Sequence, residues 1–482
     1  MKLSYIKKAC CYLLVAASLS SCQKYIDLEP ENSTYDEVFW KDAENISKAT
    51  NGAYFLLRNA LRMERSYFIF GDIAAGNFKV GSDHWNMTSF SKSGNFNFHY
   101  APYLESALWN WTRFYEIINQ ANRIIENTPL IPDENFSAGA KEKNALIAEA
   151  HFIRAYVNFY MQRVWGDVLL IKESYKDPQN IPPVARSSQK ETMEFCIADL
   201  KFAIDNLDNN TKTKASKGAA QALLAHVYAW QHDYVNAEKL STDVINGGYS
   251  LESSEDIRNI WAGGSKESIF ELNMLYSESG GENDRNFFNI FLTDPVVKGK
   301  GKGSAWTLDV DFKESYFEDA EARFDSVFRK GDGSTEFYLR KYDNVKYFEP
   351  GRTDIYAVSN NLVIYRLADI YLLRAESYFK NGKTQLALDD LNRIRERAGL
   401  EKLASAGSDL FTEIFKERRR ELIGEGSAQF DVIRMGFLNK LEFEDYYSES
   451  RINAQGYYWP LDMRALLPQD ELLTQNPWWK NN

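Results

Sequence analysis

Residues 223–240 and 372–391 read LLAHVYAWQHDYVNAEKL and LLRAESYFKNGKTQLALDDL, and the two stretches share one pattern. Each contains a small residue, an aromatic residue three positions later and a second small residue nine positions after that: Ala225, Tyr228 and Ala237 in the first, and Ala375, Tyr378 and Ala387 in the second. Small residues on two consecutive helices allow those helices to pack closely. The pattern therefore predicts helical hairpins joined by short turns.

This arrangement resembles the tetratricopeptide repeat, in which helical pairs stack side by side. Apolar residues recur at helical spacing over three regions, 41–61, 104–247 and 362–424, and Gly166 follows the most regular run as a stop signal. We expect a mainly α fold with about four repeat units, two of them poorly marked. The helices expected in it are 41–61, 104–127, 141–165, three within 188–247, two within 362–398 and one at 408–424.

Two long stretches interrupt this periodicity. Residues 64–103 and 248–361 are rich in Gly, Asn, Ser and aromatic residues. Loops of this length are usually functional or disordered, and disordered segments are poor in aromatics. We therefore expect ordered, irregular insertions that lean on the helical scaffold, with a short strand or hairpin around 334–348.

The amino-terminal segment has the features of a secretory signal. Three lysines precede an uncharged apolar run from Ala9 to Leu19, which is shorter than the roughly 20 residues of a membrane-spanning helix. The sequence Leu19-Ser20-Ser21-Cys22 resembles the lipobox of bacterial lipoproteins, whose cysteine carries a diacylglycerol. We expect residues 1–21 to be a signal peptide, Cys22 to be lipidated and 22–482 to form one domain; the alternative is an ordinary cleaved signal with an incidental cysteine.

Charge and cysteine content limit the remaining possibilities. The formal net charge is −11, so a nucleic-acid partner is not expected, because such binding requires a basic surface. After Cys22 the chain has one further cysteine, Cys196, in the apolar stretch MEFCIADL. No internal disulfide is therefore expected, and Cys196 is predicted to be buried.

Six stretches, in this order, resemble one known family, the SusD/RagB-like outer-membrane lipoproteins of Bacteroidetes. They are DLEPENSTYDEVFWKDAENISKATNGAY (27–54), LWNWTRFYEIINQANRIIE (108–126), EAHFIRAYVNFYMQRVWGDVLL (149–170), YRLADIYLLRAESYFKNGKTQLALDDLNRIRERAGL (365–400), KERRRELIGEGSAQFDVIRMG (416–436) and YYWPLDMRALLPQDELLTQNPWW (457–479). Gly76 departs from the family pattern, which often has a second acid there. The motif charges at Arg366, Asp369, Arg374 and Glu376, and at 418–421, are expected to cross-link helices.

The resemblance implies a function at the cell surface. A member of this family captures a nutrient, most often a glycan, and acts with a SusC-like TonB-dependent transporter in the outer membrane. We therefore expect a lipid-anchored protein on the outer face of the outer membrane that binds an oligo- or polysaccharide. Two alternatives stay open, a peptide-binding member of the same family and a repeat scaffold without a small ligand.

The insertions contain the candidate ligand-binding residues. Sugar rings pack their C–H faces on aromatic side chains, and their hydroxyls require fixed polar partners. The candidates are Trp85, Asn86, Tyr276, Trp306 and Trp261, together with Asp72, which the family pattern retains. Each tryptophan could equally be a local hydrophobic plug.

Catalytic motifs are missing from the sequence. It contains no G-x-S-x-G elbow and no H-E-x-x-H pair, and the Gly-Lys-Thr at 382–384 lacks the first glycine of a P-loop. Pairs of acidic residues suited to glycoside hydrolysis occur by chance among 68 acids. We expect no enzymatic activity, no cofactor and no bound metal.

Overall fold

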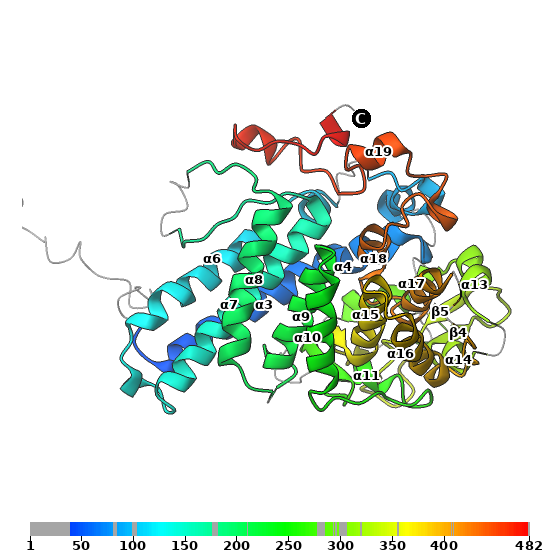
Figure 1. Ribbon diagram of the computed structural model, residues 1–482, viewed down its shortest axis with the longest axis horizontal. Helices are drawn as coiled ribbons and strands as arrows, with labels where there is room; N and C mark the ends of the chain where they lie inside the picture. The colour runs from blue at the N-terminus through cyan, green and yellow to red at the C-terminus, as the bar shows by residue number, and fades with distance from the viewer. Residues whose placement is uncertain are drawn as a thin grey trace, which may run out of the picture.

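Helices that pack side by side make up most of the molecule (Figure 1). This computed structural model describes residues 39–80, 84–98, 104–175, 182–209, 211–276, 285–292, 294, 296–297, 306–318, 321–353, 356–405, 407 and 409–480. The scaffold helices are α3 (Ala43–Arg62), α6 (Thr112–Asn127), α7 (Ala140–Trp165), α8 (Gln189–Asn206), α9 (Lys217–Trp230), α10 (Tyr234–Ile245), α15 (Leu367–Lys380), α16 (Thr384–Arg397) and α17 (Leu410–Glu421).

Local sequence signals fix where these helices begin and end. Ser188 and Glu191 form a reciprocal capping box at the start of α8, and the Asp42 carboxylate accepts from the Asn45 amide at the start of α3. Helix α7 ends at Gly166, which has φ of 77°. These bounds confirm the helices predicted from periodicity, apart from the two differences given below.

Consecutive helices form the pairs that the repeat predicts. Helix α7 packs on α8, α9 on α10, α15 on α16 and α3 on α6, and α10 also packs against α15. Ala225, Ala229 and Ala237 are fully buried and meet Leu373 in a separate small core where α9, α10 and α15 converge. The mainly α, tetratricopeptide-like fold is therefore confirmed, and its small residues lie where the helices approach most closely.

Two predicted helices differ from the structure. The stretch 104–127 is broken around Trp109 and Trp111 into the short α5 (Glu105–Leu108) and α6, because both indoles turn into the core. Leu362–Arg366 forms strand β8 ahead of α15, because its apolar and β-branched residues pair with strand β2 (Ser268–Leu272) from the second insertion.

The insertions carry the remaining short elements. Their helices are α4 (Ser66–Gly71), α11 (Asn259–Ala262), α12 (Arg285–Phe288), α13 (Val310–Tyr316) and α14 (Ala322–Val327), and α18 (Ala428–Arg434) and α19 (Glu449–Asn453) follow the scaffold. Antiparallel pairs join β1 (Phe78–Val80) to β3 (Trp306–Leu308), β4 (Phe328–Lys330) to β5 (Phe337–Leu339), and β6 (Val345–Tyr347) to β7 (Tyr356–Val358). The described parts are thus ordered as expected, and the strand expected near 334–348 is present as β5 and β6.

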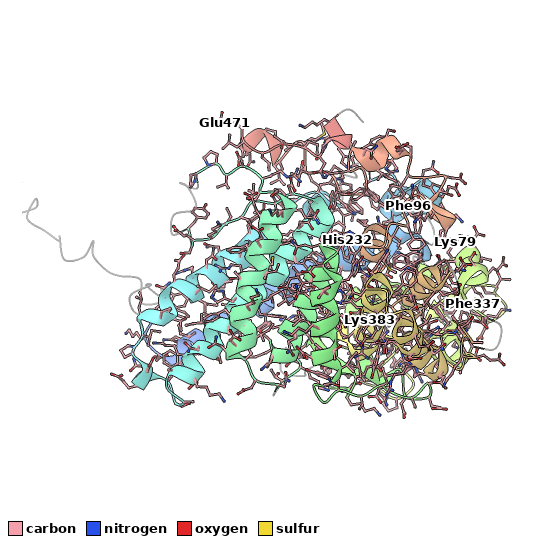
Figure 2. The ribbon with its side chains drawn as sticks, viewed as in Figure 1. Lys79, Phe96, His232, Phe337, Lys383 and Glu471 are labelled. Carbon is pink, nitrogen blue, oxygen red and sulfur yellow. The ribbon has the colours of Figure 1, made fainter. Side chains whose placement is uncertain are left out.

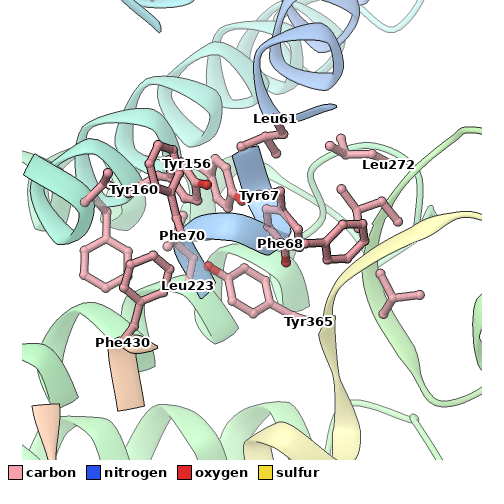
Figure 3. Close-up of a cluster of buried hydrophobic side chains, with 14 of the residues drawn as sticks. Leu61, Tyr67, Phe68, Phe70, Tyr156, Tyr160, Leu223, Leu272, Tyr365 and Phe430 are labelled. Atoms are coloured by element: carbon pink, nitrogen blue, oxygen red, sulfur yellow. The ribbon is translucent and has the colours of Figure 1, made fainter. Parts of the chain in front are cut away.

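Aromatic side chains dominate the core between scaffold and insertions (Figure 3). The ring of Tyr67 on α4 stacks on Tyr160 of α7 at a centroid distance of 6.4 Å. Its neighbour Phe68 contacts Phe287, Phe291 and Tyr342 of the second insertion at 4.8, 4.9 and 5.7 Å. Helix α4 therefore joins the two insertions to the helical scaffold.

Two further findings concern the sequence predictions. Cys196 is fully buried, and its thiol donates to the Ala155 carbonyl at 3.5 Å, which confirms a packing role. Among the residues that the structure describes, no helix has the length and apolarity that crossing a bilayer requires.

A network of buried ion pairs joins the charged residues of the motif helices to the insertions. Arg366 binds Glu267, Glu421 and Glu425 at 2.6–2.9 Å, and Arg323 shares Glu421 and binds Glu417 at 2.6 Å. Neighbouring pairs connect Arg418 with Asp369 and Asp431, Arg434 with Glu376, and Arg374 with Asp390. The predicted cross-linking role of these charges is confirmed.

This network predicts a loss of stability in acid. Burial alone would raise the pKa of Glu417, but the guanidiniums of Arg323 and Arg420 outweigh it and lower this pKa to about 2. Because the folded pKa lies below the unfolded one, the contribution is complete above about pH 4.5 and disappears as the pH falls toward 2. We expect Glu417 alone to contribute on the order of 3 kcal/mol at neutral pH.

Urea unfolding followed by circular dichroism between pH 7 and pH 2.5 measures this effect. Glu417→Gln should be less stable than the native protein at pH 7, and the difference between the two should shrink steadily below pH 4.5. A difference that stays constant down to pH 2.5 would contradict the assignment to Glu417.

Candidate functional site

The two insertions, which lie far apart in the sequence, meet along strands β1 and β3. Val80 pairs with Trp306 in this ladder, and Lys92 of the first insertion binds Asp311 of the second at 2.8 Å. A small pocket of about 20 Å³, lined by Gly76, Lys92, Asp309 and Glu442 among others, lies beside this contact. The β1–β3 pairing brings the segment that carries Trp306 next to the strand that precedes Trp85.

Buried rings form the floor of this region. Phe291 lies 5.2 Å from Phe78 and 5.6 Å from Trp306 between ring centroids, and Phe288 stacks on Tyr342 at 4.5 Å. All five rings have exposed fractions of 1% or less. The insertions therefore have a core of their own that holds their surface loops in place.

Trp261 and Trp306 belong to this floor and not to the surface. Both are 0% exposed. The Trp261 indole lies 6.3 Å from the Tyr342 ring, with the Lys341 ammonium 4.6 Å from its centroid. The expectation that these two indoles present stacking faces to a ligand is corrected, because both pack inside the insertions. They act as local hydrophobic plugs, which was the alternative stated for each tryptophan.

Asp72 is a structural carboxylate. It is fully buried and accepts hydrogen bonds from the amides of Gly424 and Gly426 at 2.8 and 2.7 Å and from the Asn77 side chain at 3.0 Å. Burial raises its pKa to about 6, although these donors oppose the shift. The Asp72 carboxylate is buried against the turn Gly424-Glu425-Gly426 and offers no surface to a ligand. The binding role expected for Asp72 is therefore corrected.

Gly426 shows why this turn requires glycine. Its φ is 74°, and a Cβ at this position would lie 2.3 Å from the Tyr67 ring.

The nearby Arg419 guanidinium donates to the Ala75 carbonyl and to Asn77 Oδ1 at 2.9 and 2.6 Å. The E-R-R motif and the 72–77 loop therefore hold the start of the first insertion against α17.

Tyr276 is the expected ligand-binding residue that the structure leaves partly exposed. Its ring contacts Phe348 at a centroid distance of 4.9 Å and an interplanar angle of 49°. Phe348 is 43% exposed and its neighbour Tyr347 is 40% exposed. We call Tyr276, Tyr347 and Phe348 the aromatic cluster.

Secondary structure fixes the position of this cluster. Tyr347 ends β6 and pairs with Tyr356 on β7, where the two rings lie 6.2 Å apart. The Tyr356 hydroxyl donates to Asn289 Oδ1 at 2.8 Å, and the Tyr276 amide donates to Ser359 Oγ at 3.2 Å. These contacts hold the cluster in place, and exposed charged side chains such as Lys346 and Glu349 lie beside it in the sequence.

Trp85 and Asn86 lie in the 3₁₀ helix His84–Phe90, which packs against β1. Their side chains lie outside the described residues. The backbone places both on the insertion that pairs with the second one through β1 and β3. Their ligand-binding role therefore stays a prediction.

Tyr347 and Phe348 are the residues that sequence reasoning missed. The signal was an aromatic pair followed by Glu-Pro at the end of a predicted strand, in YFEP. Two exposed rings of this kind, one of them tilted against Tyr276, provide apolar faces for C–H groups, and the charged side chains nearby provide polar partners. The arrangement is suited to binding and contains no nucleophile–base pair.

Comparison with known proteins identifies the family to which this architecture belongs. Residues 327–479 match the family model described as "SusD family", and residues 24–229 match the model described as "Starch-binding associating with outer membrane". The two matches cover most of the scaffold and the C-terminal part, and residues 230–326 lie between them. The chain is a member of the SusD/RagB-like family.

Curated relatives extend over nearly the whole chain. A SusD-like protein of Bacteroides ovatus is 28% identical over 474 residues, which cover 90% of this chain and 82% of that protein. The SusD-like protein P38 of Formosa agariphila is 25% identical over 522 residues, 97% of each chain. The resemblance found in six motifs therefore holds along the sequence between them.

Solved structures share the fold. A SusD superfamily protein from Bacteroides thetaiotaomicron matches with a TM-score of 0.76 at 25% identity, over 91% of this chain and 99% of that one. NanU of B. fragilis matches with a TM-score of 0.71 at 20% identity, over 93% and 99% of the two chains. This member of the SusD/RagB-like family thus has the architecture of its superfamily.

Proposed function

We propose that this protein binds a glycan on the aromatic cluster and delivers it to a SusC-like TonB-dependent transporter in the outer membrane. The observation that carries the proposal is the exposed pairing of Tyr276 with Phe348, beside Tyr347, on a chain of the SusD/RagB-like family. The matching family model described as starch-binding supports the class of ligand.

The physical basis of binding is the fit between rings and sugar faces. An aromatic side chain offers 150–250 Å² of largely apolar area, and one ring tilted against another follows the curvature of a chain of sugars. Affinity for a single sugar unit can be weak, because several contacts along one polymer increase avidity. Trp85 and Asn86, on the adjoining insertion, would extend the same surface.

Attachment to the membrane completes the proposal. Cys22 and the signal residues 1–21 lie outside the described residues, and the lipid anchor rests on the lipobox sequence. An anchored protein beside a transporter keeps captured chains near the pore, and no chemical step is required of it. Release into the transporter would follow from movement of the protein relative to the pore.

Affinity electrophoresis in gels that contain single polysaccharides tests the ligand and the surface together. At least one polysaccharide should retard the native protein, and removal of the cluster by Tyr276→Ala, Tyr347→Ala and Phe348→Ala should weaken that binding by about tenfold or more, since stacking contacts contribute about 1–3 kcal/mol. Trp85→Ala, tested separately, measures how far the surface extends.

Leu386→Ala is the matched control. Leu386 is 46% exposed in the first turn of α16, on the helical scaffold, so its removal should leave retardation unchanged. Retardation that survives removal of the cluster would show that the glycan binds elsewhere. Binding of an extended peptide library in place of any polysaccharide would favour the peptide-binding alternative.

A further inference from the structure

A second hollow lies on the helical scaffold, away from the aromatic cluster. It is an open pocket of about 680 Å³, including its mouth, between α7 and the connection from α8 to α9. Its apolar wall consists of Ala145, Leu207 and Ala215, and its polar groups are Glu149, Asp208, Thr211 and Lys214. No element that carries the aromatic cluster contributes to it.

Glu149 is the unusual member of this pocket. Its carboxylate lies close to Tyr54 of α3, whose hydroxyl accepts from the Ala215 amide at 2.7 Å. The carboxylate oxygen Oε2 is buried and has no hydrogen-bond partner within the described part of the chain. Burial raises the Glu149 pKa, and the Lys214 ammonium opposes that shift. A buried carboxylate oxygen without a donor is costly, and such groups usually receive a partner.

The charges around the pocket are balanced. Lys214 faces Glu149, and Asp208 is paired at the rim with Lys141 at 2.8 Å. A ligand with a net charge would therefore gain little from the pocket as a whole. A neutral molecule with hydroxyl donors would satisfy Glu149 Oε2 and still accept from Lys214 or Thr211.

A second pocket of about 950 Å³ adjoins the first and shares Thr211 with it. Half-buried Tyr249 lines it, together with Gly247, Gly248 and Gly264. A Cβ added at Gly248 or Gly264 would meet no atom within 4 Å. Glycines and one aromatic ring allow the close approach of a ring-shaped ligand. Without the open space at their mouths, the two hollows have volumes of about 330 and 490 Å³, which is the size of small-molecule binding sites.

We propose that the hollows on either side of Thr211 form a second binding site for a neutral oligosaccharide, with Glu149 Oε2 as the acceptor of its hydroxyls. The identity of the ligand class rests on the glycan-binding function proposed above. A second site on the scaffold would let one polymer contact the protein at two places and so raise avidity.

Saturation-transfer NMR tests the site in a background from which the aromatic cluster has been removed by Tyr276→Ala, Tyr347→Ala and Phe348→Ala. The probes are glucose, galactose, mannose, xylose and arabinose, together with maltose, cellobiose and lactose. At least one should bind this background. Glu149→Gln should then weaken its binding by about tenfold or more, because a hydrogen bond to a charged group is lost.

Stability separates a binding role from a packing role. Glu149→Gln removes a buried charge and should melt no lower than its parent while it binds sugar less well. Thr211→Val, at a partly buried residue that both hollows share, provides a second variant that should also weaken binding and leave the melting temperature unchanged.

The outcomes distinguish this site from the proposed function. Absence of sugar binding in the cluster-deleted background, or binding that neither pocket variant weakens, overturns the second site. The proposed function stands in both cases if the native protein is retarded by a polysaccharide through its aromatic cluster. Retardation of the native protein that survives cluster removal and is lost with Glu149→Gln would instead support this site and overturn the role of the cluster.

Discussion

Replacing Arg366 by methionine should lower the free energy of unfolding by about 3–5 kcal/mol, because removing one member of a buried ion-pair network leaves its partners uncompensated. Arg366 is 1% exposed, ends β8 and is the residue immediately before α15. Its guanidinium donates to Glu267, Glu421 and Glu425 and to the Glu421 carbonyl, all at 2.6–2.9 Å. The change therefore uncouples the β2–β8 pair from the end of α17.

A matched substitution on the surface should have almost no effect. Lys383 binds both oxygens of Glu238 at 2.7 and 2.9 Å, but it is 47% exposed and lies at the turn between α15 and α16 (Figure 2). Lys383→Met should cost less than about 1 kcal/mol, since solvent screens such a pair. Equal losses for the two variants in urea unfolding would contradict the importance assigned to burial.

A double-mutant cycle then identifies the source of the loss. Glu425 keeps Lys341 as a partner at 2.5 Å when Arg366 is removed, but the network then has one negative charge in excess. Glu425→Gln in the Arg366→Met background should therefore recover part of the stability, because it removes that excess charge. If the two changes are instead additive, Arg366 acts mainly by filling space, and the electrostatic account of the network fails.

The scaffold was predictable because its information is local. Ala225, Tyr228 and Ala237 specify the close packing of α9 on α10 within eighteen residues of sequence, and Ser188 and Gly166 mark helix ends by hydrogen bonding and backbone conformation of their own. The E-R-R and Arg366 motifs were correctly assigned to cross-linking, although their partners in the insertions were not foreseen.

The candidate site was only partly predictable because its geometry depends on contacts between distant segments. Trp306 is buried because β3 pairs with β1, which lies some two hundred residues earlier in the sequence. No local feature of GSAWTLD indicates that pairing. Trp261 packs against Tyr342 and Lys341 for the same reason. The exposure of Phe348, in contrast, results from a β6–β7 hairpin whose second strand lay outside the predicted one.

Replacing Cys22 by serine should move the protein from the membrane fraction to the soluble fraction almost completely. Each buried methylene contributes about 0.8 kcal/mol to membrane binding, so a single myristoyl chain holds only reversibly while two or more long chains hold stably. Serine lacks the thiol that receives the diacylglycerol. Fractionation of cells that express the native and variant proteins, with detergent extraction of the membranes, measures the redistribution.

Cys196 supplies the control for this experiment, since it is the one other cysteine that follows the signal. Its buried thiol packs between α8 and α7, so Cys196→Ser should affect stability but leave the protein in the membrane fraction. Mass spectrometry of the native protein should find acyl chains on Cys22 as the first residue. An unmodified Cys22, or a Cys22→Ser variant that sediments with the membranes, would show that another feature of the chain holds it there.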